Sequence, residues 1–322
     1  MGTVVALAAQ LGGAKLADGF YRLRGDKLTV VVNTGDDYEQ FGLTFSPDVD
    51  TMLYTLAGIE SPTAGWEPEG ETFSMFDMLK RLGGPDRFRI GDRSLAATLL
   101  RSGGLQSGRR LTTITLDFCH ALGISARVIP ATDDPLRTHV LTDDGAVPFQ
   151  EYFVDLGCEP EVRGFQYAGA EQARMSDELL EALYAPDLEA VVLCPSNPYH
   201  SIRPILEVNG MKEVLRRCGA PVIAVTPIIG GHALKGSAAK MMHELRRETS
   251  ARSVAMEYLR IIDGFVLDET DVGLAEGIRA SGIEVTSTNT IMHSVDDRIA
   301  LAQKVLDFAH AVRDAKALAE ET

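Results

Sequence analysis

Seven short runs rich in Val, Leu and Ile recur along the chain, and most of them are bounded by Gly, Pro, Asn or Asp. Turn residues follow each run, and a segment whose apolar residues repeat with the helical period comes next. This alternation is typical of β-α units that build a largely parallel sheet. We therefore expect a single α/β domain over residues 1–322, Rossmann-like, with helices flanking the sheet. The runs predict strands at residues 4–9, 28–32, 126–129, 190–193, 221–225, 264–267 and 283–286.

Two regions depart from the alternation. Residues 62–125 contain three helical patterns, MFDMLKRLG, SLAATLLRSG and RRLTTITLDFCHALG, which predict a helical lobe over the strand ends. Residues 130–169 alternate apolar and polar positions, with Asp144 and Gly145 where a hairpin turn belongs, and predict a short antiparallel excursion attached to the main sheet. The C-terminal segment DDRIALAQKVLDFAHAVRDAKALAEE predicts a long amphipathic helix, which either packs the sheet edge or contributes to a homodimer.

The composition and net charge limit the kinds of ligand that the protein can bind. With 45% hydrophobic and 24% charged residues, the 322-residue chain has the composition of a globular protein. Its formal net charge of −15 disfavours nucleic acid and anionic membranes as partners, so a polyanionic ligand needs local Lys or Arg, backbone N–H groups or a divalent cation.

The location of the protein follows from three further features. The N-terminal apolar run lacks a preceding basic region and predicts a first strand, not a signal peptide. No apolar run approaches the ~20 residues of a membrane span. The four cysteines are far apart and form no C-x-x-C pair, which indicates reduced thiols. We therefore expect a cytoplasmic protein.

The first β-α turn, AAQLGGAKLADGF, is a candidate phosphate site. Gly12 and Gly13 precede a predicted helix start, where backbone N–H groups and the positive end of a helix can approach an anion, with Lys15 in support. The G-x-G-x-x-G pattern of dinucleotide-binding proteins is not satisfied. Tight packing of the strand against the helix is an equally simple explanation for the two glycines.

Two later turns carry further candidate phosphate ligands. LCPSNPYHSIRPIL places Ser196, Asn197 and Ser201 directly after a predicted strand, where they either bind a phosphate or base edge or form an Asx-type turn that caps a short helix. VTPIIGGHALKGSAAKMM follows the next strand and ends in a predicted helix. Its order of Lys and Gly is reversed relative to a P-loop, but Gly230, Gly231 and Lys235 remain candidate phosphate contacts.

Four aspartates surround the turn after the second predicted strand, in NTGDDYEQFGLTFSPDVDT. Asp36 and Asp37 follow the strand directly, and Asp48 and Asp50 lie in the first turn of a predicted helix that Ser46 caps. Asp48 and Asp50 either complement the helix dipole or join Asp36 and Asp37 at the carboxyl end of the sheet, where open parallel sheets bind ligands. Ionised carboxylates that lie close together there repel one another and raise the free energy of the folded state unless a cation lies between them. The pattern therefore favours a Mg²⁺-dependent site.

The arginines supply candidate ligand contacts, and the arrangement of the histidines argues against one type of catalysis. FRIGDRSLAATLLRSGGLQSG contains Arg89, Arg93 and Arg101, which suit bidentate contacts to phosphates or heteroaromatic oxygens, or else ordinary surface ion pairs. The seven histidines form no Ser/His/Asp or metal-ligand spacing. Covalent nucleophilic catalysis is therefore not favoured.

Several of these blocks resemble the 2-phospho-L-lactate transferase family of deazaflavin coenzyme F420 biosynthesis. The blocks are GGAKLADGFYR, VVNTGDDYEQFGLTFSPDVDTMLYTLAG, FRIGDRSLAATLLRS, FQEYFV, CPSNPYHSIRPIL, TPIIGGHALKG and IIDGFVLDETD, in the order of the family. The resemblance implies a Mg²⁺-dependent transferase of phosphorus-containing groups. It would move a phospho-three-carbon acid from a guanosine diphosphate ester to the ribityl hydroxyl of the deazaflavin Fo and release GMP. Phospholactate, phosphoenolpyruvate and phosphoglycerate all stay open as the acid.

The resemblance also implies roles for individual residues. The Fo contacts would be Asp50 and Arg89, with Asp50 and Asp48 as catalytic residues, and all four aspartates would serve the metal. The remaining candidates would hold the guanosine nucleotide and its phosphates: Gly12, Gly13, Lys15, Ser196, Asn197, Ser201, Gly230, Gly231 and Lys235. The chain departs from the family at Ala9 and Gln10, which stand where glycines are usual, and a side chain at position 10 can change which donor fits.

Two other classes of protein were weighed against the transferase. Gluconeogenesis-factor proteins, which are non-catalytic nucleotide-binding regulators, look like distant relatives, but they tend to have a glycine- and serine-rich segment where this chain has TGDDYEQFGLTFSPDVDT. An NAD-type oxidoreductase is disfavoured, because the first turn lacks G-x-G-x-x-G and no acidic residue closes the second strand in the expected way. The expected partners are thus small-molecule substrates and a second copy of the chain.

Overall fold

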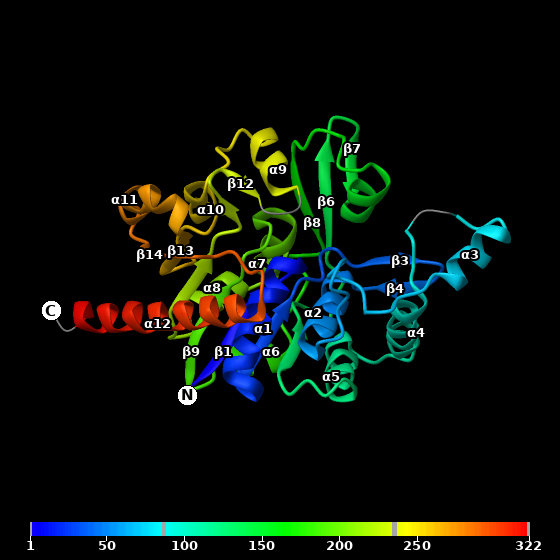
Figure 1. The fold of residues 1–322 in the computed structure, drawn as a ribbon, viewed down its shortest axis with the longest axis horizontal. Coiled ribbons are helices and arrows are strands. Elements are labelled where there is room, and N and C mark those ends of the chain that lie inside the picture. The colour runs from blue at the N-terminus through cyan, green and yellow to red at the C-terminus, as the bar shows by residue number, and fades with distance from the viewer. Residues whose placement is uncertain (1, 86–87, 234–236, 321–322) are drawn as a thin grey trace.

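The computed structural model describes residues 2–85, 88–233 and 237–320. A seven-stranded sheet with the order β14-β13-β10-β9-β1-β2-β5 forms its centre (Figure 1), and every pairing within it is parallel. The seven predicted strands are confirmed, with ends shifted by a residue or two. They are β1 (Thr3–Ala8), β2 (Leu28–Val32), β5 (Arg127–Pro130), β9 (Leu188–Leu193), β10 (Val222–Val225), β13 (Gly264–Asp268) and β14 (Glu284–Thr288).

Helices cover both faces of the sheet, which explains why its strands read as nearly continuous apolar runs. In β1, Val4 and Ala6 face one core and Val5 and Leu7 face the other, as the two-residue period of a strand requires. The first core is covered by α1 (Gln10–Arg24), α2 (Pro47–Ala57), α5 (Leu111–Ala121) and α12 (Val295–Glu320). The second core is covered by α6 (Asp177–Leu183), α7 (Arg203–Glu207), α8 (Met211–Arg217), α9 (Ala238–Glu244), α10 (Ala251–Glu257) and α11 (Ala275–Arg279).

The long C-terminal helix α12 packs on a face of the sheet and not at its edge, so that expectation was wrong. It lies beside α1 (Figure 1), and its Leu301, Val305 and Leu306 are fully buried or nearly so. The two helices approach closely at Gly19, where an added Cβ would stand 2.1 Å from the carbonyl oxygen of Arg298. A glycine at this point of α1 therefore lets the two helix backbones meet.

The helical region 62–125 divides into two parts. Helix α5 packs against β5 and α2 and so belongs to the body of the domain. Helices α3 (Ser74–Arg81) and α4 (Asp92–Gln106) project to one side with the hairpin of β3 (Tyr38–Gln40) and β4 (Leu43–Phe45), as Figure 1 shows. This hairpin, where the sequence predicts only a turn, follows β2 in the chain and packs against α4 of the lobe.

The predicted antiparallel excursion forms a sheet of its own, with the order β7-β6-β8. Strands β6 (Arg137–Thr142) and β7 (Gly145–Pro148) are joined by a turn at Asp143 and Asp144, one residue earlier than expected, and β8 (Gly164–Ala168) pairs with the other edge of β6. We call these three strands, with the short π-helical turn η2 (Glu151–Asp155), the arm.

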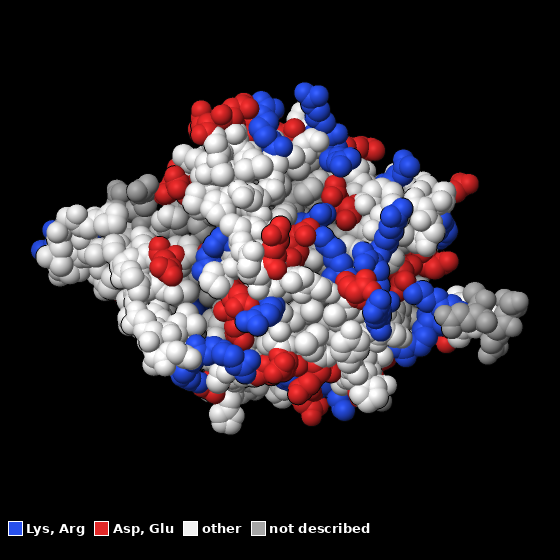
Figure 2. Space-filling view, turned by 180° about the vertical axis from the view of Figure 1, so that it is seen from behind, with Lys and Arg blue, Asp and Glu red and all other residues white. Residues whose placement is uncertain are grey.

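The surface and the cysteines add little that distinguishes this fold. On the face shown in Figure 2, acidic and basic side chains lie interspersed. Across the described ranges, no helix combines the length and the apolar character that a membrane crossing requires. The four cysteines are free thiols, and Cys119 and Cys194 are buried, in agreement with the expectation of reduced thiols.

Candidate active site

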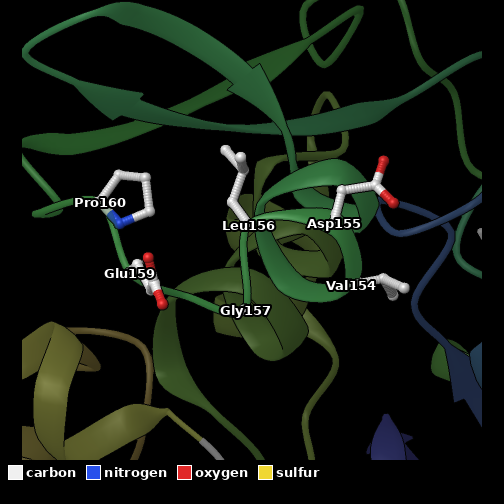
Figure 3. Close-up of a pocket in the computed structure, with 6 residues that line it drawn as sticks. All are labelled: Val154, Asp155, Leu156, Gly157, Glu159 and Pro160. Atoms are coloured by element: carbon white, nitrogen blue, oxygen red, sulfur yellow. The ribbon is translucent and has the colours of Figure 1, made fainter.

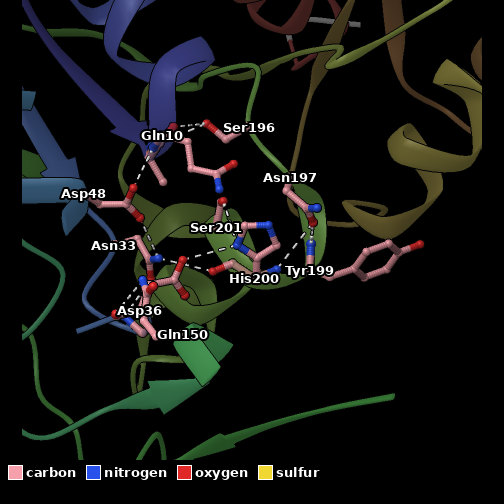
Figure 4. A network of polar contacts seen from close by, with 12 residues as sticks. Gln10, Asn33, Asp36, Asp48, Gln150, Ser196, Asn197, Tyr199, His200 and Ser201 are labelled. Atoms are coloured by element: carbon pink, nitrogen blue, oxygen red, sulfur yellow. Dashed lines mark hydrogen bonds and ion pairs between the residues drawn. The ribbon is translucent and has the colours of Figure 1, made fainter. Parts of the chain in front are cut away.

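The polar side chains at the centre of the molecule gather where β1, β2 and β9 end. Asn33 follows β2 directly and is fully buried; its amide nitrogen donates to Asp48 Oδ2 at 2.9 Å and to the carbonyl oxygen of His200 at 3.2 Å. The backbone N–H of Gln10, the first residue of α1, donates to Asp48 Oδ1 at 2.8 Å. Asp48, from the first turn of α2, thus joins three elements that are far apart in the sequence (Figure 4).

The second carboxylate of this cluster, Asp36, faces a buried histidine. His200 Nδ1 lies 3.2 Å from Asp36 Oδ2, and its ring stacks on Phe149 with the centroids 4.1 Å apart. The side-chain amide of Gln150, next to Phe149 at the end of β7, donates to the carbonyl oxygen of Asp36 at 3.2 Å. The arm therefore closes over the loop after β2, and the other oxygen of Asp36, Oδ1, is buried without a hydrogen-bond partner.

The other two aspartates lie toward the lobe and are neutralised differently. Asp50 forms an ion pair with Arg101, whose side chain is fully buried in α4; Nη1 donates to Asp50 Oδ2 at 3.2 Å, and Nη2 contacts Oδ1. Asp37 accepts a hydrogen bond of 2.8 Å from Ser46 Oγ. Ser46 precedes α2 as predicted, but its hydroxyl serves Asp37 and does not cap the helix.

Burial dominates the electrostatics of the cluster. It is the main cause that raises the pKa of Asp48 to about 7; the charge of Asp36 adds to the rise, and the amide of Asn33 opposes it. Burial also raises the pKa of Asp37 to about 7 against the opposing charges of Arg137 and Arg101, and it raises the pKa of Asp36 well above the usual range. Burial lowers the pKa of His200 to about 4, so the imidazole is neutral near pH 7. The side of Asp36 and Asp48 thus holds excess negative charge whenever both are ionised.

The structure gives Gly12 and Gly13 a packing role. Helix α1 begins at Gln10, earlier than the sequence indicated, so both glycines lie inside its first turn. A Cβ at Gly12 would stand 2.2 Å from the carbonyl oxygen of Pro195, and one at Gly13 would stand 2.7 Å from Ser196 Oγ. Lys15 donates to the carbonyl oxygen of Met292 at 2.9 Å, ahead of α12. These contacts bring α1 against the turn after β9.

The turn after β9 is held by its own polar side chains. Ser196 Oγ donates to the carbonyl oxygen of Ala9 at 2.8 Å, which ties this turn to the β1-α1 turn. Asn197 Oδ1 accepts from the backbone N–H of Tyr199 at 2.9 Å, the Asx-type arrangement that was weighed as an alternative. Ser201 is fully buried, with Oγ 3.4 Å from Nδ1 of His200. All three lie at the same edge of the sheet as Asp36 and Asp48 (Figure 4).

The remaining candidates lie apart from this centre. Gly230 and Gly231, between β11 (Ile228–Ile229) and β12 (His232–Ala233), face the segment after β13, where Asp271 accepts from the Gly230 N–H at 2.9 Å. Arg89 places its guanidinium 3.4 Å from the ring centroid of Phe73 in the lobe. Lys235 lies outside the described residues.

Two shallow cavities flank the region. One of about 300 Å³ is lined by Gly231, Thr249, Thr270, Asp271 and neighbours, beyond the end of β13. The other, of about 310 Å³, lies on the arm; Figure 3 shows Val154 and Asp155 on η2 and Glu159 and Pro160 on the segment after it. Neither cavity includes any of the four aspartates.

Sequence reasoning missed four residues of the cluster, which are Asn33, Phe149, Gln150 and His200. It named Arg101 but not its ion pair with Asp50. The only local signal was the position of Asn33 directly after a buried strand and of His200 inside the PSNPYHS turn. In the described part of the chain, no three His, Cys, Asp or Glu side chains converge closely enough to hold a metal ion by themselves. A metal here would need ligands from a substrate as well.

The fold and the site together define the class of protein. A parallel sheet covered on both faces, with a buried polar cluster at the carboxyl ends of its central strands, is the architecture of Rossmann-like α/β proteins, which bind their ligands at that edge. A family model described as 2-phospho-L-lactate transferase CofD matches residues 4–299. The chain belongs to this family, which confirms the resemblance found in the sequence, and it is a transferase.

Relatives and solved structures agree with this membership. The chain is 37% identical over 317 residues to a phosphoenolpyruvate transferase of Streptomyces griseus, across 96% of this chain and 99% of the relative. It is 34% identical over 304 residues to a 2-phospho-L-lactate transferase of Methanosarcina mazei, across 94% and 99%. A crystal structure of a UPF0052-family protein from Bacillus halodurans superimposes with a TM-score of 0.62 at 16% identity, across 95% and 99%, and shows the likeness of fold alone.

Proposed function

We propose that this protein transfers a phospho-three-carbon acid from a guanosine diphosphate ester to the ribityl hydroxyl of the deazaflavin Fo, in the biosynthesis of coenzyme F420. The observation that carries the proposal is the cluster of four buried or nearly buried aspartates at the carboxyl edge of the sheet, in a chain of the CofD family. Such a cluster suits a reaction whose demands are positioning, charge neutralisation and acceptance of a proton.

The transfer makes one bond and breaks one bond. The hydroxyl oxygen of the acceptor attacks the distal phosphorus, the bond from that phosphorus to the bridging oxygen breaks, and GMP leaves with the bridging oxygen. The hydroxyl proton passes to a carboxylate. We assign this role to Asp50, which is 13% exposed and so reaches a ligand, whereas Asp48 is more deeply buried. The ion pair with Arg101 holds the Asp50 carboxylate in place and opposes the rise in its pKa that burial causes.

The cluster also fits a magnesium ion. Asp36 Oδ1 is buried without a hydrogen-bond partner, and each oxygen of Asp48 accepts a single hydrogen bond and keeps a lone pair free. Mg²⁺ is typically bound by one or two carboxylates together with substrate phosphates and water. We propose Asp36 and Asp48 as its protein ligands, with Asp37 and Asp50 as supporting charges. When bound, the ion would neutralise the charge of the donor diphosphate.

The donor and acceptor then lie on opposite sides of Asp48. The turn after β9, with Ser196, Asn197 and Ser201, and the β11-β12 turn at Gly230 and Gly231 lie on the nucleotide side, over β9, β10 and β13. Asp50 and Arg89 lie on the lobe side, where we place the deazaflavin. A donor laid along the carboxyl edge would bring its distal phosphorus to the Asp48 and Asp50 end.

Mass spectrometry of the products tests the proposal. The purified protein is incubated with Mg²⁺, Fo and a mixture of the guanylylated phospholactate, phosphoenolpyruvate and phosphoglycerate donors. We expect GMP and a deazaflavin phosphodiester whose mass identifies the acid. The Arg89→Ala protein is the matched control for the acceptor side, and its KM for Fo should rise while its KM for the donor stays the same. Absence of any deazaflavin product from wild-type protein would contradict the proposal.

A further inference from the structure

Gln10 adopts a backbone conformation that its side chain disfavours. Its φ is +54°, in the left-handed region that glycine occupies readily and that a side chain disfavours. The residue is also the first of α1, and its backbone N–H is bonded to Asp48. Strain of this kind is kept at functional sites when the surrounding structure or a ligand makes use of it.

The Asp48 contact explains the backbone of Gln10 but not its side chain. The bond to Asp48 uses only the main-chain N–H, which glycine would supply without strain. The side-chain amide is partly exposed and has no hydrogen-bond partner among the described residues, while its neighbours Asn33, Asp48 and His200 are buried and bonded. In Figure 4 the amide points toward Ser201, in the turn after β9.

The position of this amide indicates which group of the donor it would contact. Asp48 marks the boundary toward the acceptor, and the turn that carries Ser201 belongs to the nucleotide side. A donor that extends from the nucleotide side to Asp50 would bring its distal phosphate and three-carbon acid beside the partly exposed Gln10, because that phosphate is the one the acceptor attacks. An amide N–H is a suitable donor for a carboxylate, and its carbonyl oxygen can accept from a hydroxyl.

We propose that Gln10 is a specificity-determining residue whose side-chain amide binds the carboxylate of the three-carbon acid of the donor. The inference rests on the proposed function and adds the residue that recognises the three-carbon acid. A hydrogen bond to a charged group is worth about ten-fold or more in affinity, which is enough to set a preference among acids that differ by a methyl, a methylene or a hydroxymethyl group.

The variant Gln10→Gly tests this role, since it keeps the backbone N–H to Asp48, relieves the strain and removes only the amide. We expect the KM of the preferred donor to rise about ten-fold with little change in kcat or in the KM of Fo, and the discrimination between acids to shrink. Arg260→Gly is the matched control, because Arg260 is also a non-glycine residue at positive φ (+67°). It is exposed and lies between α10 and β13, outside the cluster of aspartates. The melting temperature of Arg260→Gly can rise, but its donor KM should not change.

Calorimetry separates the acid from the diphosphate and this inference from the proposed function. GDP carries the diphosphate without the acid, so Gln10→Gly should weaken binding of the donors about ten-fold and leave binding of GDP unchanged. An unchanged donor affinity, or an equal loss for GDP, would overturn the assignment to the acid. Donor binding is measured without Fo, so it tests the role of Gln10 even if the wild-type protein forms no deazaflavin product. Absence of that product would contradict the proposed function but not the role of Gln10.

Discussion

The four aspartates fall into two pairs that the protein treats differently. Asp36 and Asp48 are held by amides, by a backbone N–H and by the neutral ring of His200, with no cationic side chain bonded to either carboxylate among the described contacts. Asp37 and Asp50 lie on the side of Arg101, which is bonded to Asp50 and opposes the rise in pKa that burial causes in both.

The difference separates two roles that look identical in the sequence. A carboxylate already paired with a buried arginine has its charge compensated and its geometry fixed, which suits a group that orients and deprotonates a hydroxyl. Two buried carboxylates without a cation are costly when ionised, and an added cation removes that cost. We therefore expect a metal at the first pair and the acceptor at the second.

The largest effect is expected from breaking the Asp50–Arg101 pair. Asp50→Ala should lower turnover about 10³-fold, the scale of a lost general base, and should also destabilise the fold by about 3 kcal/mol because Arg101 stays buried without a partner. Steady-state kinetics and urea unfolding measure the two effects.

A double variant separates catalysis from folding in that experiment. Asp50→Ala combined with Arg101→Met removes the unpaired charge, so stability should recover while turnover does not. If the double variant recovers both, Asp50 acts only through the fold.

The next effect distinguishes the two pairs by their affinity for magnesium. Asp36→Asn should weaken Mg²⁺ binding in the presence of GDP about 10- to 100-fold, because it removes a charged ligand from the pair that lacks a cation. Asp37→Asn is the matched change in the neighbouring residue and should have little effect, since Arg137 and Arg101 already oppose a second cation there. Isothermal titration reads both, and equal losses in the two variants would contradict the division.

The smallest effect is a dependence of stability on pH. Burial raises the pKa of Asp48 from 3.8 to about 7, so its contribution to stability is complete at low pH and is lost as the pH rises through 7. Between pH 5.5 and pH 8, metal-free wild-type protein should therefore lose roughly 2 kcal/mol relative to Asp48→Asn, which cannot ionise. Thermal unfolding at both pH values measures the gap.

Asp268→Asn provides the control for that measurement. Hydrogen bonds from Thr290 and Thr270 keep the pKa of Asp268 low against the effect of burial, so its titration lies below the range tested. The gap between wild type and Asp268→Asn should stay constant from pH 5.5 to pH 8. A constant gap for Asp48→Asn as well would show that Asp48 does not titrate in that range.

The fold was predictable because both faces of the sheet are buried. Each strand then reads as an apolar run in its own right, and the parallel order follows from the helices between the runs. The β3-β4 hairpin escaped prediction because its partly exposed residues, such as Glu39 and Thr44, form no apolar alternation. The start of α1 was misplaced because Gln10 has a positive φ and no side-chain cap precedes it, so no local signal marks the helix start.

The site was predictable in its location but not in its internal contacts. Chain position placed the aspartates and the PSNP turn at one edge of a parallel sheet, which is a property of the topology. The partners of each carboxylate depend on packing between segments as distant as Asp36 and His200, which no local pattern records. The same holds for Gly12 and Gly13, whose small size serves a close approach to Pro195 and Ser196.

The central place of β1 also has a consequence for synthesis of the chain. Strand β1 pairs with β2 on one side and with β9 on the other, and β9 begins only at Leu188, more than half of the chain later. During translation, one edge of this buried strand therefore stays unpaired until β9 leaves the ribosome, and long-range parallel pairing of this kind is slow. Truncated chains that end before Leu188 should aggregate, and a chaperone that shields this edge should raise the yield of folded enzyme.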